Sequence, residues 1–252
     1  MSRKAPRRFY REVGIAERDG AFAVLLDGKP AKTPRGASLQ LPSLALAEAI
    51  AEEWRAQGEH LAPSNMLLTG LANAAIDRAS TQRGQVIEHI LAFGRSDLVC
   101  YRAEAPASLV ERQKETWDPL LAWAWEKYKL RLLSDMGISY IEQPMDAAVR
   151  MRELASALDE FLLAAFEPAT ALTGSFILAL ALIDGHIGAE QAFAAAQLDE
   201  LYQAGKWGRD SEAEQRRGRL FAELNAIELF VRLLRDMHHK QQQEHKGGSG
   251  LS

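Results

Sequence analysis

The chain has 252 residues, of which 47% are hydrophobic and 25% charged, enough for one large domain or two smaller ones with an ordinary core. A formal net charge of -4 argues against a dedicated nucleic-acid-binding protein, because such proteins carry an excess of basic residues. The single cysteine, Cys100, excludes an internal disulfide and fits a reducing compartment.

Basic residues are concentrated near the start, with nine Lys and Arg against four Asp and Glu in the first 40 positions. No apolar run follows these basic residues, which argues against a secretory signal peptide. The segment also contains few serines, which argues against a mitochondrial presequence. The longest apolar run, residues 169–183, is shorter than the about 20 residues that a spanning helix needs. We therefore expect no membrane insertion and a cytoplasmic location in a bacterium, or the mitochondrial matrix if the source is eukaryotic.

Residues 1–42 predict a β-rich N-terminal domain. Apolar residues alternate from Val13 to Leu41, and the dipeptides Asp19-Gly20 and Asp27-Gly28 interrupt them. Asp-Gly readily adopts the positive φ angles of tight hairpin turns. The pattern predicts a small antiparallel β-meander, and a strand predicted at 138–141 is a candidate to extend its sheet.

From Ser43 onward apolar residues recur at spacings of three and four, which is typical of helices. Pro119 is expected to end or kink one helix, and Pro168 to lie in the first turn of another. The predicted fold class is α+β, in which the β-meander domain is joined to a larger, mainly helical bundle domain at 43–237 and a disordered tail at 238–252. The expected helices are 43–57, 69–79, 82–93, 106–128, 146–166, 168–183, 188–204 and 211–237.

Motifs for cofactor chemistry are absent from the sequence. It contains no glycine-rich phosphate loop, no H-E-x-x-H, no C-x-x-C, and no serine elbow flanked by a strand and a helix. We expect no cofactor, no metal site and no small-molecule substrate.

Two alternatives remain open. A hydrolase or isomerase would use the acidic residues around Trp207, and it requires two carboxyls in different environments within one closed cleft. Those acids are Asp199, Glu200, Asp210 and Glu212. A helical adaptor would instead bind another protein through an apolar seam on the last helix, formed by Leu220, Leu224, Ile227, Val231 and Leu234.

Eight phrases, in order over roughly residues 9–235, resemble one family. They are Phe9-Tyr10, LDGKPAKTP (26–34), LPS with LAEAIAEEWRAQ (41–57), MLLTGLANAAID (66–77), SDLVCYRAE (96–104), QKETWDPLLAW (113–123), TGSFILALAL (173–182) and LDELYQAGKWG (198–208). The family is that of the assembly chaperones that bind the alpha subunit of the F-type ATP synthase catalytic head.

The resemblance implies a non-enzymatic chaperone with a small β-containing domain and a larger helical one. Its partner would be the unassembled alpha subunit, whose exposed surface it would protect from aggregation. It would bind no nucleic acid.

The resemblance also implies a partner-binding site after the pair Trp207-Gly208. Mitochondrial members resemble W-G-x-x-E, whereas this chain has Ser211 at the last position of that pattern, between Asp210 and Glu212. Glu212 is the first candidate for the acidic role and Asp210 the second.

Overall fold

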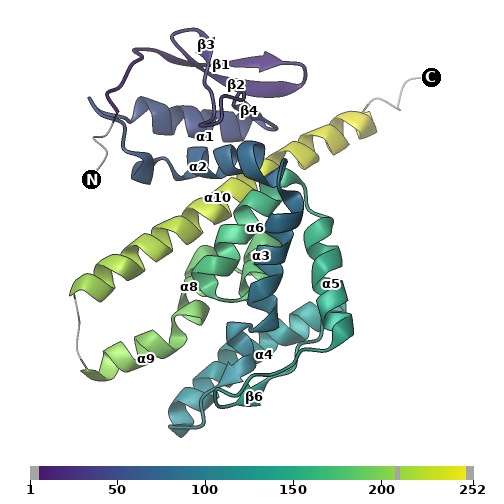
Figure 1. The fold of residues 1–252 in the computed structure, drawn as a ribbon. Helices are drawn as coiled ribbons and strands as arrows, with labels where there is room; N and C mark the ends of the chain where they lie inside the picture. Colours follow the sequence, from purple (N-terminus) through teal and green to yellow (C-terminus); the bar gives the residue numbers. More distant parts are fainter. Residues whose placement is uncertain (1–5, 208–210, 248–252) are drawn as a thin grey trace. The chain divides into compact units, whose positions relative to one another are not determined.

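The computed structural model describes residues 6–207 and 211–247, with the side chains of 6–204 and 211–235. These residues form two compact units (Figure 1). Of the described residues, 6–81 and 229–247 belong to the first unit, and 82–207 and 211–228 belong to the second. The division differs from the boundary expected at 42 and 43, because the first helices after the sheet group with it.

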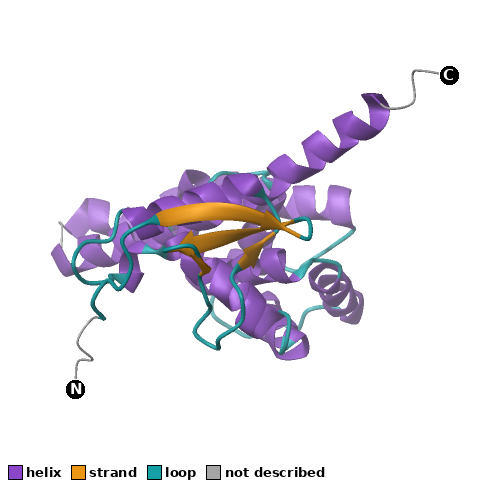
Figure 2. Cartoon of the chain, turned by 90° about the horizontal axis from the view of Figure 1, so that it is seen from above, coloured by secondary structure: helices purple, strands orange, loops and turns teal. Residues whose placement is uncertain are grey.

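The first unit holds a four-stranded antiparallel sheet in which β2 is the central strand. The two long strands, β1 and β2, lie side by side from Val13↔Leu26 to Arg18↔Ala21 (Figure 2). Both β3 and β4 pair with β2. The predicted N-terminal sheet is therefore confirmed. The strands are β1 Val13–Arg18, β2 Ala21–Leu26, β3 Lys29–Pro30 and β4 Gln40–Leu41.

Both Asp-Gly pairs form hairpin turns with positive φ angles. Asp19 and Gly20 have φ of 53° and 76°, and Asp27 and Gly28 have 48° and 76°. Two consecutive left-handed residues match the right-handed twist of the strands they join. The Oδ1 atom of Asp27 also accepts backbone N–H bonds from residues 11 and 12, and these bonds lower the pKa of its carboxyl.

Helix α1 covers one face of this sheet and is fixed at both ends. At its start, the Ser43 hydroxyl accepts the N–H of Leu46 at 3.1 Å. Near its end, the hydroxyl of Tyr10 donates to the carbonyl of Trp54 at 2.7 Å. Glu53 accepts the two N–H groups that begin α2, each at 2.8 Å, and so caps that helix. The helical elements here are α1 Leu44–Arg55, η1 Pro63–Asn65, α2 Leu67–Ala74 and the π-helical turn η2 Ala75–Ala79.

The second unit is a helical bundle around α7. Every residue from Phe176 to Ile183 is at most 5% exposed, so this helix is apolar on all sides. Helices α3, α4, α6 and α8 contact it. The elements are α3 Arg83–Arg95, η3 Leu98–Cys100, β5 Tyr101–Arg102, α4 Ala107–Tyr128, β6 Asp135–Met136, α5 Met145–Ser156, α6 Glu160–Thr173, α7 Phe176–Asp184, α8 Ala189–Ala196 and α9 Leu198–Trp207. Helix α10, Ser211–Gly247, belongs to this unit up to Glu228 and to the first unit from Leu229 onward.

A buried carboxylate joins η3 to the start of α7. Asp97 is 0% exposed and accepts backbone N–H bonds from Val99 at 3.1 Å and Ile177 at 3.0 Å. Burial raises its pKa to about 6, although the hydrogen bonds oppose this shift. The carboxylate thus accepts hydrogen bonds from backbone N–H groups at the starts of two helices, although burying an acidic group is itself unfavourable.

The strand expected at 138–141 is wrong. The strand in this region is β6, at Asp135–Met136, and it pairs in parallel with β5 of the second unit rather than with the N-terminal sheet. Gly137, with φ of +88°, turns the chain directly after β6, and the side chain of Ile138 is 98% exposed.

Pro119 does not end its helix, and the expectation that Pro168 lies in the first turn of a helix is wrong. Pro119 lies inside α4 and Pro168 inside α6, which begins at Glu160. The packing of Trp117, Leu120 and other buried residues of α4 outweighs the hydrogen bond lost at Pro119. In the expected 146–166 helix a break lies before Asp159, whose carboxylate accepts the N–H of Leu162 at 2.8 Å and so begins a new helix.

Among the helices in the described part of the chain, none combines the length and apolar character needed to cross a membrane.

Candidate partner-binding site

The residues expected to bind the partner surround the junction of α9 and α10. Trp207 is the last residue of α9, and its side chain is outside those described. Gly208 and Asp210 lie outside the described residues altogether. Glu212 is described, and it is exposed in the first turn of α10.

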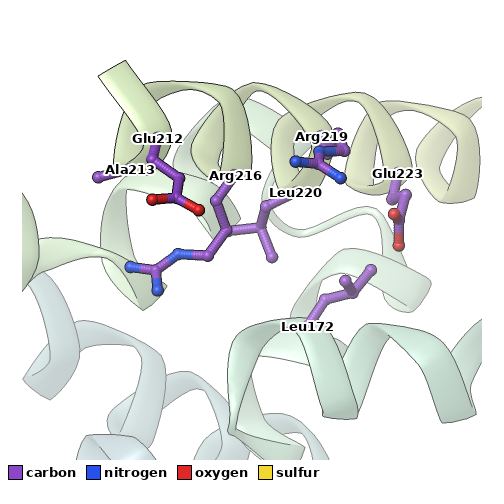
Figure 3. A pocket seen from close by; sticks show the side chains of 7 residues that line it. All are labelled: Leu172, Glu212, Ala213, Arg216, Arg219, Leu220 and Glu223. Atoms are coloured by element: carbon purple, nitrogen blue, oxygen red, sulfur yellow. The ribbon is translucent and has the colours of Figure 1, made fainter. Parts of the chain in front are cut away.

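Glu212 lines a groove of about 600 Å³ between α10 and α6 (Figure 3). Leu172 projects from α6 towards α10, and Leu220 contributes a second apolar side chain. The remaining lining residues are Ala213, Arg216, Arg219 and Glu223. Because the charged members are all exposed, this is an open groove of mixed charge with an apolar floor.

An ion pair links α10 to α9. The Nη2 atom of Arg216 lies 2.9 Å from Oε2 of Glu200, and both side chains are about half exposed or more. An exposed pair of this kind contributes only about 0–1 kcal/mol of stability.

The neighbouring acid, Asp199, contacts a different helix. The amide of Gln113 on α4, which is 1% exposed, donates to Oδ1 of Asp199 at 2.8 Å. The same amide accepts the N–H of Ala103 at 2.8 Å. Asp199 therefore helps to hold α9 against α4.

Of the four acids of the carboxylate alternative, the three that the structure describes, Asp199, Glu200 and Glu212, do not line one closed cleft. The groove contains the carboxylates of Glu212 and Glu223, whereas Asp199 and Glu200 are not among its lining residues. Acid-base catalysis needs two carboxyls in one enclosed site, so this geometry does not favour that alternative.

The apolar seam of α10 is mostly buried in the chain itself. Leu224 is 0% exposed, Ile227 2% and Val231 3%, whereas Leu220 borders the groove. A seam that the chain already covers is not a free face for an adaptor.

Five groove residues were not expected from the sequence: Leu172, Ala213, Arg216, Arg219 and Glu223. A signal for two of them exists, since Arg219 and Glu223 are four positions apart and so share a helix face with the similarly spaced Glu212 and Arg216. Leu172 gives no such signal, because its position beside α10 depends on how the helices pack.

Comparison with known proteins gives one consistent result. A model of the ATP12 chaperone protein family matches residues 7–125. Protein atp12, mitochondrial, from Schizosaccharomyces pombe is 28% identical over 247 residues, covering 93% of this chain and 85% of that protein.

Solved structures agree over most of the chain. The crystal structure of Atp12 from Paracoccus denitrificans has a TM-score of 0.85 and 42% identity, covering 91% of this chain and 99% of that one. A mutant of the P. denitrificans protein gives the same identity and TM-score, with 98% of that chain covered. The chain belongs to the ATP12 chaperone protein family.

Proposed function

We propose that the chain is a chaperone for ATP synthase assembly that binds the unassembled alpha subunit of the F-type enzyme and prevents its aggregation. The observation that carries this proposal is the match to Atp12 of P. denitrificans over 91% of the chain. The ordered phrases between residues 9 and 235 support the alpha subunit as the partner, through the resemblance they carry.

The physical task is one of competition. A subunit without its neighbours exposes a large apolar interface, which drives aggregation. A chaperone that binds this surface lowers the concentration of the aggregating species by mass action, and it must dissociate when the true neighbour binds. This role needs no covalent chemistry, no cofactor and no nucleic acid.

We further propose that the groove at Glu212 contacts the partner, together with the segment Trp207–Asp210. Its exposed charges suit a contact that fixes orientation and association rate, because charged groups at a rim contribute more to these than to affinity. Such a contact also dissociates readily, as assembly requires. The role is exercised where the catalytic head is built, in the bacterial cytoplasm or the mitochondrial matrix.

The test is suppression of aggregation of the alpha subunit. Purified alpha subunit is diluted from denaturant, and light scattering is recorded against the concentration of the chain, with gel filtration to detect a complex. We expect the wild-type chain to suppress scattering and to co-elute with the alpha subunit. No suppression and no complex would overturn the proposal.

A charge reversal tests the groove. Glu212→Lys should raise the concentration needed for half-suppression by about tenfold, because it reverses a charge at the contact. The matched control is Glu190→Lys, since Glu190 is also an exposed glutamate in the first turn of a helix, α8. Equal effects of the two variants would remove Glu212 from the site but leave the chaperone role intact.

A further inference from the structure

The N-terminal sheet has one long edge without a neighbouring strand. In the part of the chain that the structure describes, β1 pairs only with β2, whereas β2 also pairs with β3 and β4. A strand at the edge of a sheet presents a row of backbone N–H and C=O groups with which another strand can pair. The outer edge of β1 is therefore a surface for recognition through the main chain.

The hydrogen-bond pattern determines which residues of β1 face this edge. The N–H of Asp27 donates to the carbonyl of Glu12 at 3.0 Å, so Glu12 occupies a hydrogen-bonded position of the ladder. Such positions alternate along an antiparallel strand, which directs the backbone groups of the even-numbered residues of β1 towards β2. The N–H and C=O groups of Val13, Ile15 and Glu17 therefore point away from β2.

The strands of this sheet differ in how well they are protected from pairing. Strands β3 and β4 have two residues each, and Pro30 removes a backbone donor from β3. Strand β1 has six residues, contains neither proline nor lysine, and keeps an unbroken register with β2 from Val13 to Arg18. Short strands, prolines, lysines and bulges are the features that prevent sheet edges from pairing. The edge of β1 has none of these features.

The charges along β1 are complementary to those of the same strand in reverse. When a second copy of β1 runs antiparallel with Ile15 opposite Ile15, Glu12 of each copy lies opposite Arg18 of the other. Arg11 and Asp19 come next on either side and are opposite in charge as well. These four charged side chains are exposed. Opposite charges directly across two strands are stabilising, whereas like charges are destabilising.

The outward backbone groups are compatible with the same register. Ile15 faces its own counterpart and Val13 faces Glu17, so that outward groups meet outward groups. Shifting the second strand by two residues in either direction also joins outward groups, but it separates Glu12 from Arg18. The charges thus select a register with a twofold axis at Ile15, as a contact between identical surfaces requires. A second copy of the chain supplies this complementarity by symmetry.

We propose that β1 pairs antiparallel with β1 of a second copy of this chain, centred on Ile15, and that the two four-stranded sheets join into one. Val13 and Ile15 are only partly buried in the single chain, so pairing also covers apolar area. The carbonyl of Val13 accepts Nη2 of Arg55 at 3.4 Å, and its second lone pair can accept the N–H of the added strand. The contact is small, so the dimer is a weak one that forms at high concentration of the chain.

Sedimentation equilibrium up to about 1 mM chain measures this dimer. Arg18→Glu should raise the dissociation constant about tenfold or more, because symmetry produces the like-charge contact with Glu12 twice. Glu12→Arg should have a similar effect. The double variant, Glu12→Arg with Arg18→Glu, should return the constant to within about threefold of the wild-type value, since it restores opposite charges. A wild-type chain that stays monomeric, or a double variant as weak as the single ones, would overturn the inference.

The matched control is Lys29→Glu. Lys29 is an exposed basic residue beside the turn at Asp27-Gly28, as Arg18 is beside the turn at Asp19-Gly20, but it lies on β3. Both substitutions change the net charge equally, and we expect Lys29→Glu to leave the dissociation constant unchanged. Circular dichroism checks that each variant is folded. Equal effects of Arg18→Glu and Lys29→Glu would reflect net charge alone and would overturn the inference.

A cross-link tests the register. Opposite each other, Glu12 and Arg18 form a non-hydrogen-bonded pair with Cα atoms about 4.5 Å apart, a separation that a disulfide can span. The variant Glu12→Cys with Arg18→Cys should therefore form a covalent dimer with glutathione disulfide, while the buried Cys100 stays unreactive. A covalent dimer formed more readily by Glu12→Cys with Ala16→Cys would place the strands in another register and overturn the assignment.

The alpha subunit is the other occupant that the edge of β1 could take. If the wild-type chain stays monomeric while Arg18→Glu weakens suppression of alpha-subunit scattering and Lys29→Glu does not, the edge binds the client and self-pairing is overturned. The two assays also separate this inference from the proposed function. Dimerisation can fail while suppression of scattering persists, and suppression can fail while the dimer forms.

Discussion

Two apolar segments of the helical unit have opposite environments. In α7, every residue from Phe176 to Ile183 is buried, and the segment is surrounded by other helices. Between residues 133 and 149, six large apolar side chains are exposed. Both segments look hydrophobic in the sequence, yet only the first contributes its apolar area to the free energy of folding.

The comparison separates two uses of hydrophobic residues. Burial in α7 stabilises the fold, whereas exposed apolar area on a fixed loop is available to a binding partner. Substitutions in α7 should therefore change the stability of the fold, whereas substitutions of the exposed apolar side chains between residues 133 and 149 should leave it nearly unchanged.

The largest effect is expected at the first residue of α7, Phe176. Phe176 is 0% exposed, and its ring packs against that of Phe166 with centroids 5.1 Å apart. Phe176→Ala should lower the free energy of unfolding by about 3–5 kcal/mol, because it removes buried area and leaves a cavity. Urea denaturation followed by circular dichroism measures this. A loss below about 1 kcal/mol would contradict the central position of α7.

A smaller effect is expected at the buried acid that joins α7 to η3. Both carboxylate oxygens of Asp97 accept backbone N–H bonds, and Asp97→Asn replaces one of them with an NH2 group that only donates. The substitution should lower the free energy of unfolding by about 2 kcal/mol at pH 5. The folded state raises the pKa of Asp97 from 3.8 to about 6. The folded chain thus holds a proton that the unfolded chain releases, so the contribution of Asp97 to stability falls as the pH rises through this window.

The pH dependence provides the measurement. The difference in unfolding free energy between the wild-type chain and Asp97→Asn should shrink from about pH 4 to about pH 6 and level off above it. A difference that grows with pH would mean that Asp97 has a lowered pKa, as an ion-paired acid would.

Close helix packing predicts the next effect. A Cβ added to Gly94 on α3 would lie 2.2 Å from Sδ of Met151 and 3.3 Å from Cβ of Phe176. Gly94→Ala should therefore destabilise the chain by about 1–2 kcal/mol, since the Met151 side chain must move within a packed core. The double variant with Met151→Ala should recover part of this loss, and additivity of the two losses would contradict a shared contact.

The smallest change in stability is expected among the exposed apolar side chains between residues 133 and 149. Tyr140 is 70% exposed, and Tyr140→Ser should alter the unfolding free energy by less than about 0.5 kcal/mol. Thermal unfolding of the variant and the wild-type chain checks this. A large loss would show that the loop is part of the core, and the contrast with α7 would then fail.

The parts of the fold that the sequence predicts correctly depend on local rules. The Asp-Gly turns require positive φ angles that few other residues adopt easily, so β1 and β2 could be predicted from them. The start of α1 follows from its cap at Ser43. These features are determined by residues that are adjacent in the sequence, so they can be predicted from the sequence alone.

The parts that could not be predicted depend on tertiary packing. The helix continues through Pro119 because buried neighbours on α4 compensate for the missing hydrogen bond. Leu172 borders the groove at Glu212 because α6 packs near α10, and no pattern in the sequence carries that relation. The apolar run near Ile138 resembles a strand, but the glycine before it turns the backbone into an exposed loop.

The first compact unit is discontinuous in the chain, since it combines Met1–Thr81 with residues from Leu229 onward. The hydroxyl of Ser43, which caps α1, donates to the carbonyl of Leu233 at 2.9 Å. During translation, the core of this unit therefore cannot be completed until the final helix has emerged from the ribosome. The N-terminal segment thus lacks its final packing partner for most of the time that the chain is being synthesised.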